Sequence, residues 1–152
     1  MRADVATVGD VEFMRQAIRL AHLARDRGET PVGSIVVRDG HVIGKGIEAV
    51  RGENDLAAHA EVRAVQEACR TLNTLDLAAC TLFTTVEPCF MCSFVLRTAR
   101  IARVVIGRAV PHIGGFSSDY PILVTPNIPG WSQPPLVVAG LLEEECSAMF
   151  RR

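Results

Sequence analysis

Two short motifs constrain this chain more than any other feature, because they must meet in space if they act together. His59-Ala60-Glu61 stands near the middle of the sequence, and Pro88-Cys89-Phe90-Met91-Cys92 follows after 26 further residues. Imidazole nitrogen and thiolate sulfur are ligands that Zn²⁺ prefers, and three protein ligands leave the fourth tetrahedral position to water, as in catalytic sites. We therefore predict a zinc site formed by His59, Cys89 and Cys92, with Glu61 beside it as the group that moves protons.

Length and composition indicate a small globular protein. The chain has 152 residues, of which 49% are hydrophobic, enough for one domain over residues 1–152 with a sizeable core and too few for two. Residues 1–10 contain no apolar segment typical of a signal peptide, and no apolar run approaches the roughly 18 residues of a membrane span. The five cysteines, an odd number, suit metal binding in a reducing compartment better than a disulfide framework. We expect a cytoplasmic protein in which Cys69, Cys80 and Cys146 are buried as small apolar residues.

The charge balance argues against a broad surface for polyanions. The net charge is −1, whereas nucleic-acid binders usually carry a basic excess or stripe that neutralises phosphates. One local cluster of arginines is predicted to lie on a solvated face and at helix ends, with an RNA or subunit contact left open: Arg97, Arg100, Arg103 and Arg108.

The first half of the sequence predicts a helix, a hairpin and a second helix. Apolar residues recur at helical spacing over residues 11–24, and Gly28 follows as a C-terminal signal. Two apolar runs flank Asp39-Gly40, a pair that suits the positive φ angles of a type I′ turn, so residues 34–44 should form a β-hairpin. A loop over residues 49–57 should lead into the next helix, over residues 59–72.

The second half alternates strands and helices before a long irregular segment. The sequence predicts strands over residues 80–85, 101–106 and 136–138, helices over residues 89–99 and from residue 141, and a proline-rich loop over residues 111–135. This order predicts a mixed sheet covered by helices on both faces. Because His59 and Cys89 each begin a helix, the metal should lie where two helix N-termini converge, and their positive potential should favour thiolates at Cys89 and Cys92.

With these residues in place, the chain resembles the cytidine deaminase-like superfamily. Within it, the similarity is to the branch of bacterial tRNA adenosine deaminases, guanine deaminases and fungal-type cytosine deaminases, whose signature is H-x-E with P-C-x-x-C. Four segments carry the resemblance: Thr30-Pro31-Val32-Gly33-Ser34-Ile35-Val36-Val37, Ala58-His59-Ala60-Glu61-Val62, Thr84-Thr85-Val86-Glu87-Pro88-Cys89-Phe90-Met91-Cys92 and Arg103-Val104-Val105-Ile106-Gly107. The resemblance implies a three-layer αβα fold with a mixed sheet of about five strands, a zinc cofactor and a homodimer.

The resemblance also implies a hydrolytic deamination. Zinc would activate a water, and Glu61 would take its proton and pass protons to the ring nitrogen and the departing amine. A purely structural zinc site is the alternative, but it needs a fourth protein ligand. None of the other cysteines, nor His112, has short-range spacing to either motif.

Substrate choice is where the sequence departs from these relatives. They commonly carry an asparagine at the end of the second strand, where this chain has Glu48. An ionised carboxylate only accepts hydrogen bonds, so the pocket should prefer a ring that presents N–H groups, such as guanine or another amino-substituted heterocycle. The alternative is that Glu48 turns outward and that Asn54 or Asp55 serves instead. Val32 and Ala58, within the matching segments, and Phe116 are the further predicted substrate contacts. Phe116, on a loop over the pocket, could stack on a flat ring, and its alternative role is to pack the loop.

A tRNA adenosine deaminase is the alternative function, and a zinc-binding module without turnover is the last. Two features count against tRNA: Val110 stands where those enzymes commonly have an aspartate, and their basic C-terminal extension is not found after Arg151-Arg152. The sequence therefore predicts a deaminase of a small aminoheterocycle, with tRNA not excluded as a partner.

Overall fold

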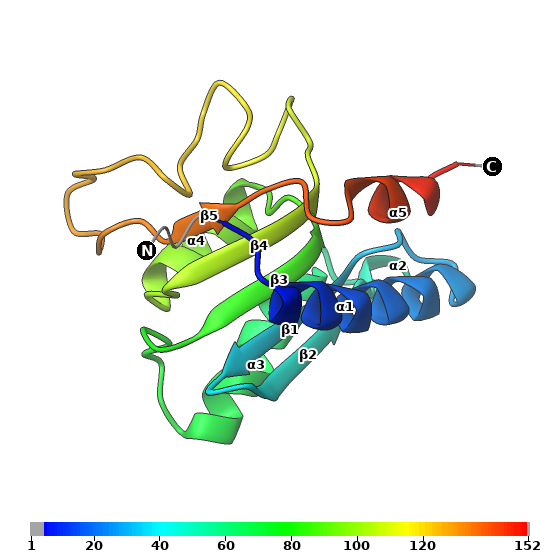
Figure 1. Ribbon diagram of the computed structural model, residues 1–152, viewed down its shortest axis with the longest axis horizontal. Helices are drawn as coiled ribbons and strands as arrows, with labels where there is room; N and C mark the ends of the chain where they lie inside the picture. The colour runs from blue at the N-terminus through cyan, green and yellow to red at the C-terminus, as the bar shows by residue number, and fades with distance from the viewer. Residues whose placement is uncertain (1–4, 152) are drawn as a thin grey trace.

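A five-stranded mixed sheet forms the centre of the structure (Figure 1). The computed structural model describes residues 5–151, so residues 1–4 and 152 of the predicted domain lie outside the described part. The spatial order β2-β1-β3-β4-β5 contains the strands β1 (Gly33–Arg38), β2 (His41–Ile47), β3 (Thr81–Val86), β4 (Arg103–Arg108) and β5 (Leu136–Val138). β1 is antiparallel to both β2 and β3, while β3, β4 and β5 are parallel to one another. The predicted mixed sheet of about five strands is confirmed.

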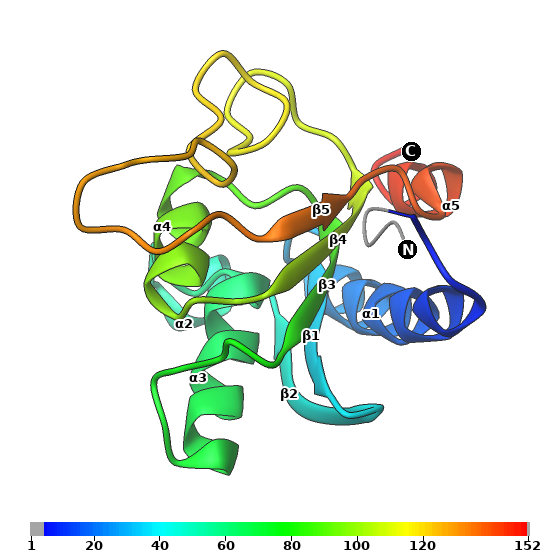
Figure 2. The same ribbon diagram turned by 60° about the vertical axis from the view of Figure 1, so that its left-hand side comes forward.

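Helices cover both faces of this sheet (Figures 1 and 2). One face carries α1 (Val8–Asp26) and α5 (Glu143–Ala148), and the other carries α3 (Ala60–Leu72) and α4 (Phe90–Thr98). A hydrophobic core lies on each side, with Val104 and Ile106 of β4 facing α3 and α4, and Val105 facing α1 and α5. The predicted three-layer αβα arrangement is therefore confirmed. One short helix, α2 (Val50–Glu53), lies in the segment predicted as loop.

Local signals explain the first helix and the hairpin. Thr7 caps α1, since its hydroxyl accepts from the Asp10 N–H at 3.1 Å while the Asp10 carboxylate accepts from the Thr7 N–H at 2.8 Å. Asp39 and Gly40 adopt φ angles of 50° and 76° between β1 and β2, as a type I′ turn requires.

Two glycines of β2 bring α3 close to the sheet. A Cβ at Gly46 would lie 2.0 Å from the Ala60 carbonyl oxygen, and one at Gly44 would lie 2.3 Å from that of Ala64. Glycine in a strand often marks such a close approach of another backbone. The N-terminus of α3, with His59 at its cap, is thereby held against the end of β2, where Glu48 follows.

Arg97 fastens the long segment over residues 111–135 to α4. Its side chain is only 2% exposed, and it donates to the carbonyl oxygens of Ile122 at 2.8 Å, Thr125 at 3.0 Å and Ser132 at 2.8 Å. Arg97 does lie in the last turn of a helix, as predicted, but the prediction of a solvated face is wrong for this residue. Buried carbonyl groups of an irregular segment need donors, and a guanidinium supplies several at once.

The other arginines of the cluster point to separate places. Arg103 forms an ion pair with the buried Asp10 at 2.6 Å, and exposed Arg100 faces Asp76 at 3.6 Å. They therefore do not form one basic surface. Within residues 5–151, no helix is both long enough and apolar enough to cross a membrane.

Candidate active site

The two motifs meet at the N-termini of α3 and α4. His59 is the N-cap residue of α3 and Cys89 that of α4, with Cys92 in the first turn. Nδ1 of His59 lies 3.6 Å from the Cys89 sulfur and 3.4 Å from the Cys92 sulfur, and the three ligand atoms all lie within 4.8 Å of one another. In a tetrahedral zinc site, bond lengths of roughly 2.3 Å to sulfur and 2.0 Å to nitrogen give S···N distances of about 3.5 Å. Both the donor atoms and their spacing fit zinc.

The three candidate ligands shift one another's pKa values even without a metal. A hydrogen bond with Cys92 lowers the pKa of Cys89 to about 4, so Cys89 is a thiolate at neutral pH. A hydrogen bond with Cys89 raises the pKa of His59 to about 9. The same interaction with Cys89, together with burial, raises the pKa of Cys92 well above its usual range. Without a metal, Cys89 and Cys92 therefore share a proton, and zinc binding, which needs both sulfurs as thiolates, must release protons.

Glu61 lies one residue inside α3 and is only 4% exposed. Burial above all, together with the negative charges of Cys89 and Glu48, raises the pKa of Glu61 to about 8. A carboxyl group with a pKa near the working pH can both take and release a proton, which general acid–base catalysis requires.

A cavity of about 340 Å³ opens beside these residues. Its lining is shared by the metal-site residues, the ends of β1, β3 and β4, and the C-terminal turn: Thr30, Val32, Glu48, His59, Glu61, Val86, Glu87, Cys89, Arg108, Val110, His112, Ile113 and Phe150. Of the predicted substrate contacts, Glu48 and Val32 thus line the cavity. Ala58 is fully buried and is not part of the lining. Phe116 packs against the core on the α3 and α4 side instead, so its role in the structure is loop packing.

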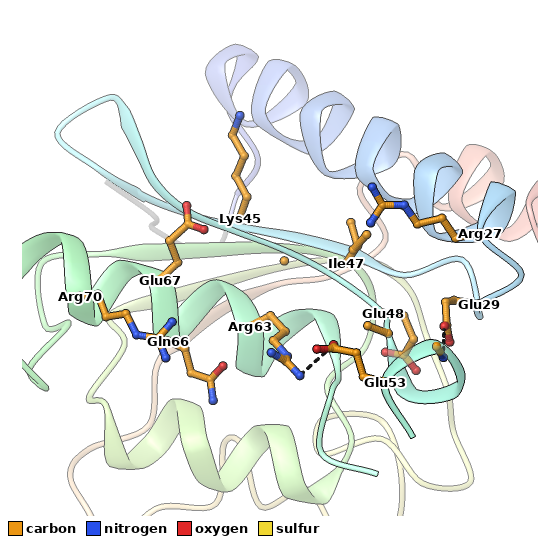
Figure 3. A pocket seen from close by; sticks show the side chains of 13 residues that line it. Arg27, Glu29, Lys45, Ile47, Glu48, Glu53, Arg63, Gln66, Glu67 and Arg70 are labelled. Carbon is orange, nitrogen blue, oxygen red and sulfur yellow. Dashed lines mark hydrogen bonds and ion pairs between the residues drawn. The ribbon is translucent and has the colours of Figure 1, made fainter. Parts of the chain in front are cut away.

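Glu48 follows directly after β2, and its backbone N–H donates to the Val32 carbonyl at 3.2 Å. Burial raises the pKa of Glu48, while the charge of His59 and the backbone N–H of Ala60 act in the opposite direction. Glu48 also lines a second, polar groove between β2, α2 and α3, where Arg63 forms an ion pair with Glu53 at 2.9 Å (Figure 3). Neither Asn54 nor Asp55 lines the cavity that contains the metal group.

Glu87 organises the loop beside the cavity, a role that the sequence analysis did not predict. One carboxylate oxygen accepts from the Val110 N–H at 2.9 Å and the Ser117 hydroxyl at 2.5 Å. The other accepts from the N–H groups of Phe116 at 2.8 Å and Ser117 at 2.7 Å. A Cβ at Gly114 would lie only 1.8 Å from this carboxylate. Buried Glu87 therefore packs against Gly114 and holds the loop that follows it. Of these residues, only the Gly114-Gly115 pair stands out in the sequence.

Comparison with known proteins identifies this arrangement. The profile of the family described as "Cytidine and deoxycytidylate deaminase zinc-binding region" matches residues 8–108, which include both motifs. The chain belongs to this family. It is therefore a zinc-dependent deaminase, and the predicted superfamily is confirmed.

Individual relatives are similar over most of the chain. The tRNA-specific adenosine deaminase of Aquifex aeolicus is 41% identical over 121 residues, which cover 80% of each protein. A solved structure from work on A-to-I editing by tRNA:A34 deaminases superposes with a TM-score of 0.84 and 34% identity, over 91% of this chain and 98% of the other. The guanine deaminase of Bacillus subtilis matches with 36% identity and a TM-score of 0.63, over 64% of this chain and 63% of its own.

Proposed function

We propose that this deaminase acts on adenosine in tRNA and converts it to inosine. The match to the tRNA:A34 deaminase structure supports this proposal best, because it combines 34% identity with 91% coverage of this chain. The guanine deaminase structure from Bacillus subtilis covers 64% of this chain, and the one from Nitrosomonas europaea covers 96% of it but is only 23% identical. The sequence alone favours a small aminoheterocycle over tRNA, in part because Val110 replaces an aspartate. Val110 is a single position, whereas the similarity to the tRNA:A34 deaminase structure covers 91% of this chain.

The residues at the cavity divide the work of hydrolysis. His59, Cys89 and Cys92 would hold the zinc, which supplies Lewis acidity that lowers the pKa of a water. The Glu61 carboxylate takes a proton from the water whose oxygen adds to C6 of adenine, and it delivers one proton to N1. A further transfer to the exocyclic amine lets ammonia leave, so water and adenosine give inosine and ammonia. Burial of Glu61 keeps its proton from exchanging with bulk solvent during these transfers.

The test is inosine formation in an unmodified tRNA that carries adenosine at the wobble position. Zinc-loaded protein should produce inosine there, measured by nuclease digestion and mass spectrometry. The matched control is the same tRNA with guanosine at that position, in which no other adenosine should react. Absence of inosine, together with ammonia release from a free base, would overturn the tRNA proposal and leave the deaminase chemistry intact.

Glu48 supports a second candidate function, the deamination of a small amino-substituted ring. Its carboxylate lines the cavity beside the metal group, and an ionised carboxylate cannot donate to the ring nitrogens of adenine, which only accept. Guanine and related rings present N–H groups instead. The partial similarity to the Bacillus subtilis guanine deaminase agrees with this candidate.

The variant Glu48→Asn tests this candidate against a panel of free bases and nucleosides. Loss of a charge-assisted hydrogen bond of ~1.5–3 kcal/mol should lower kcat/KM about 10- to 150-fold for rings that present donors. Rings read through a carbonyl, such as cytosine, should gain, because an amide donates where a carboxylate cannot. An unchanged ranking of the panel would remove Glu48 from substrate selection.

A further inference from the structure

Arg108 is placed toward the cavity by its position in β4. It is the last residue of that strand, opposite Val86 of β3. Val104 and Ile106 face α3 and α4, and side chains two residues apart share a face of a strand. Arg108 therefore points to the same side as the metal group. Three residues that follow the strand also line the cavity: Val110, His112 and Ile113.

Phe150 holds the guanidinium of Arg108 by its flat face. The guanidinium carbon lies 3.9 Å from the centre of the Phe150 ring, and both side chains line the cavity. Stacking on an aromatic ring occupies the face of a guanidinium and leaves the N–H donors on its edges available. The contact also restricts the rotamers of a long side chain, so less entropy is lost when a ligand binds.

Arg108 differs from Arg97 and Arg103 in the partners of its guanidinium group. The guanidinium of Arg97 donates to loop carbonyl oxygens, and that of Arg103 forms an ion pair with Asp10. No carboxylate within residues 5–151 forms an ion pair with Arg108. Glu87, an acidic residue of the same lining, already accepts four hydrogen bonds from residues 110–117. A cation with free edge donors at a substrate cavity is suited to bind an anion.

We propose that Arg108 binds a phosphate group of the nucleotide whose base enters the cavity, and that Phe150 positions Arg108 for this contact. The inference rests on the proposed function, because a free base carries no phosphate. Phosphate matches the paired N–H donors of a guanidinium. The phosphate could be the monoester of a mononucleotide or the diester of an RNA backbone, and the experiment separates these two sources.

The experiment measures the affinity of zinc-loaded protein for three unreactive probes. They are purine riboside, its 5′-monophosphate, and an RNA hairpin with purine riboside in its loop. If the phosphate is a monoester, the wild type should bind the monophosphate at least about tenfold more tightly than the riboside. If it is a backbone diester, only the hairpin should show this gain. Arg108→Gln should abolish the gain and leave the affinity for purine riboside unchanged.

Two further variants separate phosphate binding from a structural role. Arg151→Gln removes one arginine charge from the C-terminal turn that contains Phe150, where Arg151 pairs with Glu144 on the surface, and it should keep the full gain. Phe150→Leu should reduce the gain without abolishing it. For the hairpin, Arg108→Gln should also weaken the salt dependence by about one phosphate contact.

Three results would overturn the role of Arg108. One is equal affinity of the wild type for all three probes, and another is an equal loss for the riboside and the phosphorylated probes in Arg108→Gln. The third, where only the hairpin shows the gain, is inosine formation in tRNA with unchanged kcat/KM in Arg108→Gln, which would leave the proposed function standing. Failure of the wild type to form inosine in tRNA and to bind any probe would instead refute the proposed function, and the phosphate contact with it.

Discussion

Each of the three candidate ligands is needed for zinc, because loss of one leaves a site with two. The purified protein should carry about one zinc per chain. Cys89→Ser and Cys92→Ser should each lose the metal and lower the free energy of unfolding, since binding energy at such a site contributes to folding. Metal content is measured by atomic emission. Cys69→Ser, at a half-buried cysteine outside the metal group, is the control that should keep its zinc.

Full zinc occupancy in both serine variants would refute this ligand assignment. The buried Cys80 and Cys146 also lie outside the metal group, as the sequence analysis predicted for buried apolar residues. Burial alone raises the pKa of Cys69, which opposes the thiolate form that binds metal.

Substitution of Glu61 should affect turnover but not zinc binding. Glu61→Ala should keep both zinc and fold, yet lose at least the ~10²–10⁴-fold in kcat that a general acid–base residue usually contributes. Parallel measurement of zinc content and turnover checks this. Glu67→Ala, at an exposed position of the same helix, should leave both unchanged. Loss of zinc from Glu61→Ala would instead make Glu61 a ligand, and unchanged turnover would remove it from the mechanism.

At the scale of elements, the loop over residues 110–117 depends on one carboxylate. Glu87→Gln keeps the size of the side chain but replaces one acceptor oxygen with an NH₂ donor, so at least one backbone N–H of the loop loses its acceptor. The free energy of unfolding should fall by about 1–3 kcal/mol, the usual effect of leaving buried donors without a partner. Denaturant unfolding measures it.

Ser117→Ala is the matched comparison for this loop, since it removes only the hydroxyl contact to Glu87. Its effect should be smaller than that of Glu87→Gln. Equal stability of Glu87→Gln and the wild type would show that the loop holds its conformation by other contacts.

Elements fixed by neighbouring residues could be predicted from the sequence, whereas those fixed by contacts between distant residues could not. Asp39-Gly40 fixes the hairpin with two neighbouring residues, and His59 and Cys89 mark helix starts within their own motifs. Such signals are local and can be read from the chain. Arg97 and Glu87 instead stabilise segments 23 to 35 residues away in sequence, through buried contacts with backbone groups that have no side-chain signature. The four-residue α2 is too short for periodicity to show.

At the scale of the whole molecule, the catalytic groups and an apolar surface share one helix. The N-terminus of α4 supplies Cys89 and Cys92, while its outer side exposes Phe90 by 37%, Met91 by 37% and Phe94 by 51%. Large apolar side chains gathered on one surface are typical of interaction sites. The aromatic rings extend this surface onto the adjoining loops, through contacts of Phe90 with Tyr120 and of Phe94 with Trp131.

We expect this surface to form the predicted homodimer. Sedimentation should give twice the chain mass of 16.5 kDa, and Phe94→Glu should shift the protein to the monomer, because dimerisation would bury its new charge without a partner. Zinc content and thermal unfolding of the variant serve as controls, since the change lies beyond the ligand residues and should preserve the metal site. Arg19→Glu, at an exposed position of α1 on the opposite face of the sheet, should remain dimeric. A monomeric wild type would refute the homodimer, and a dimeric Phe94→Glu would place the interface elsewhere.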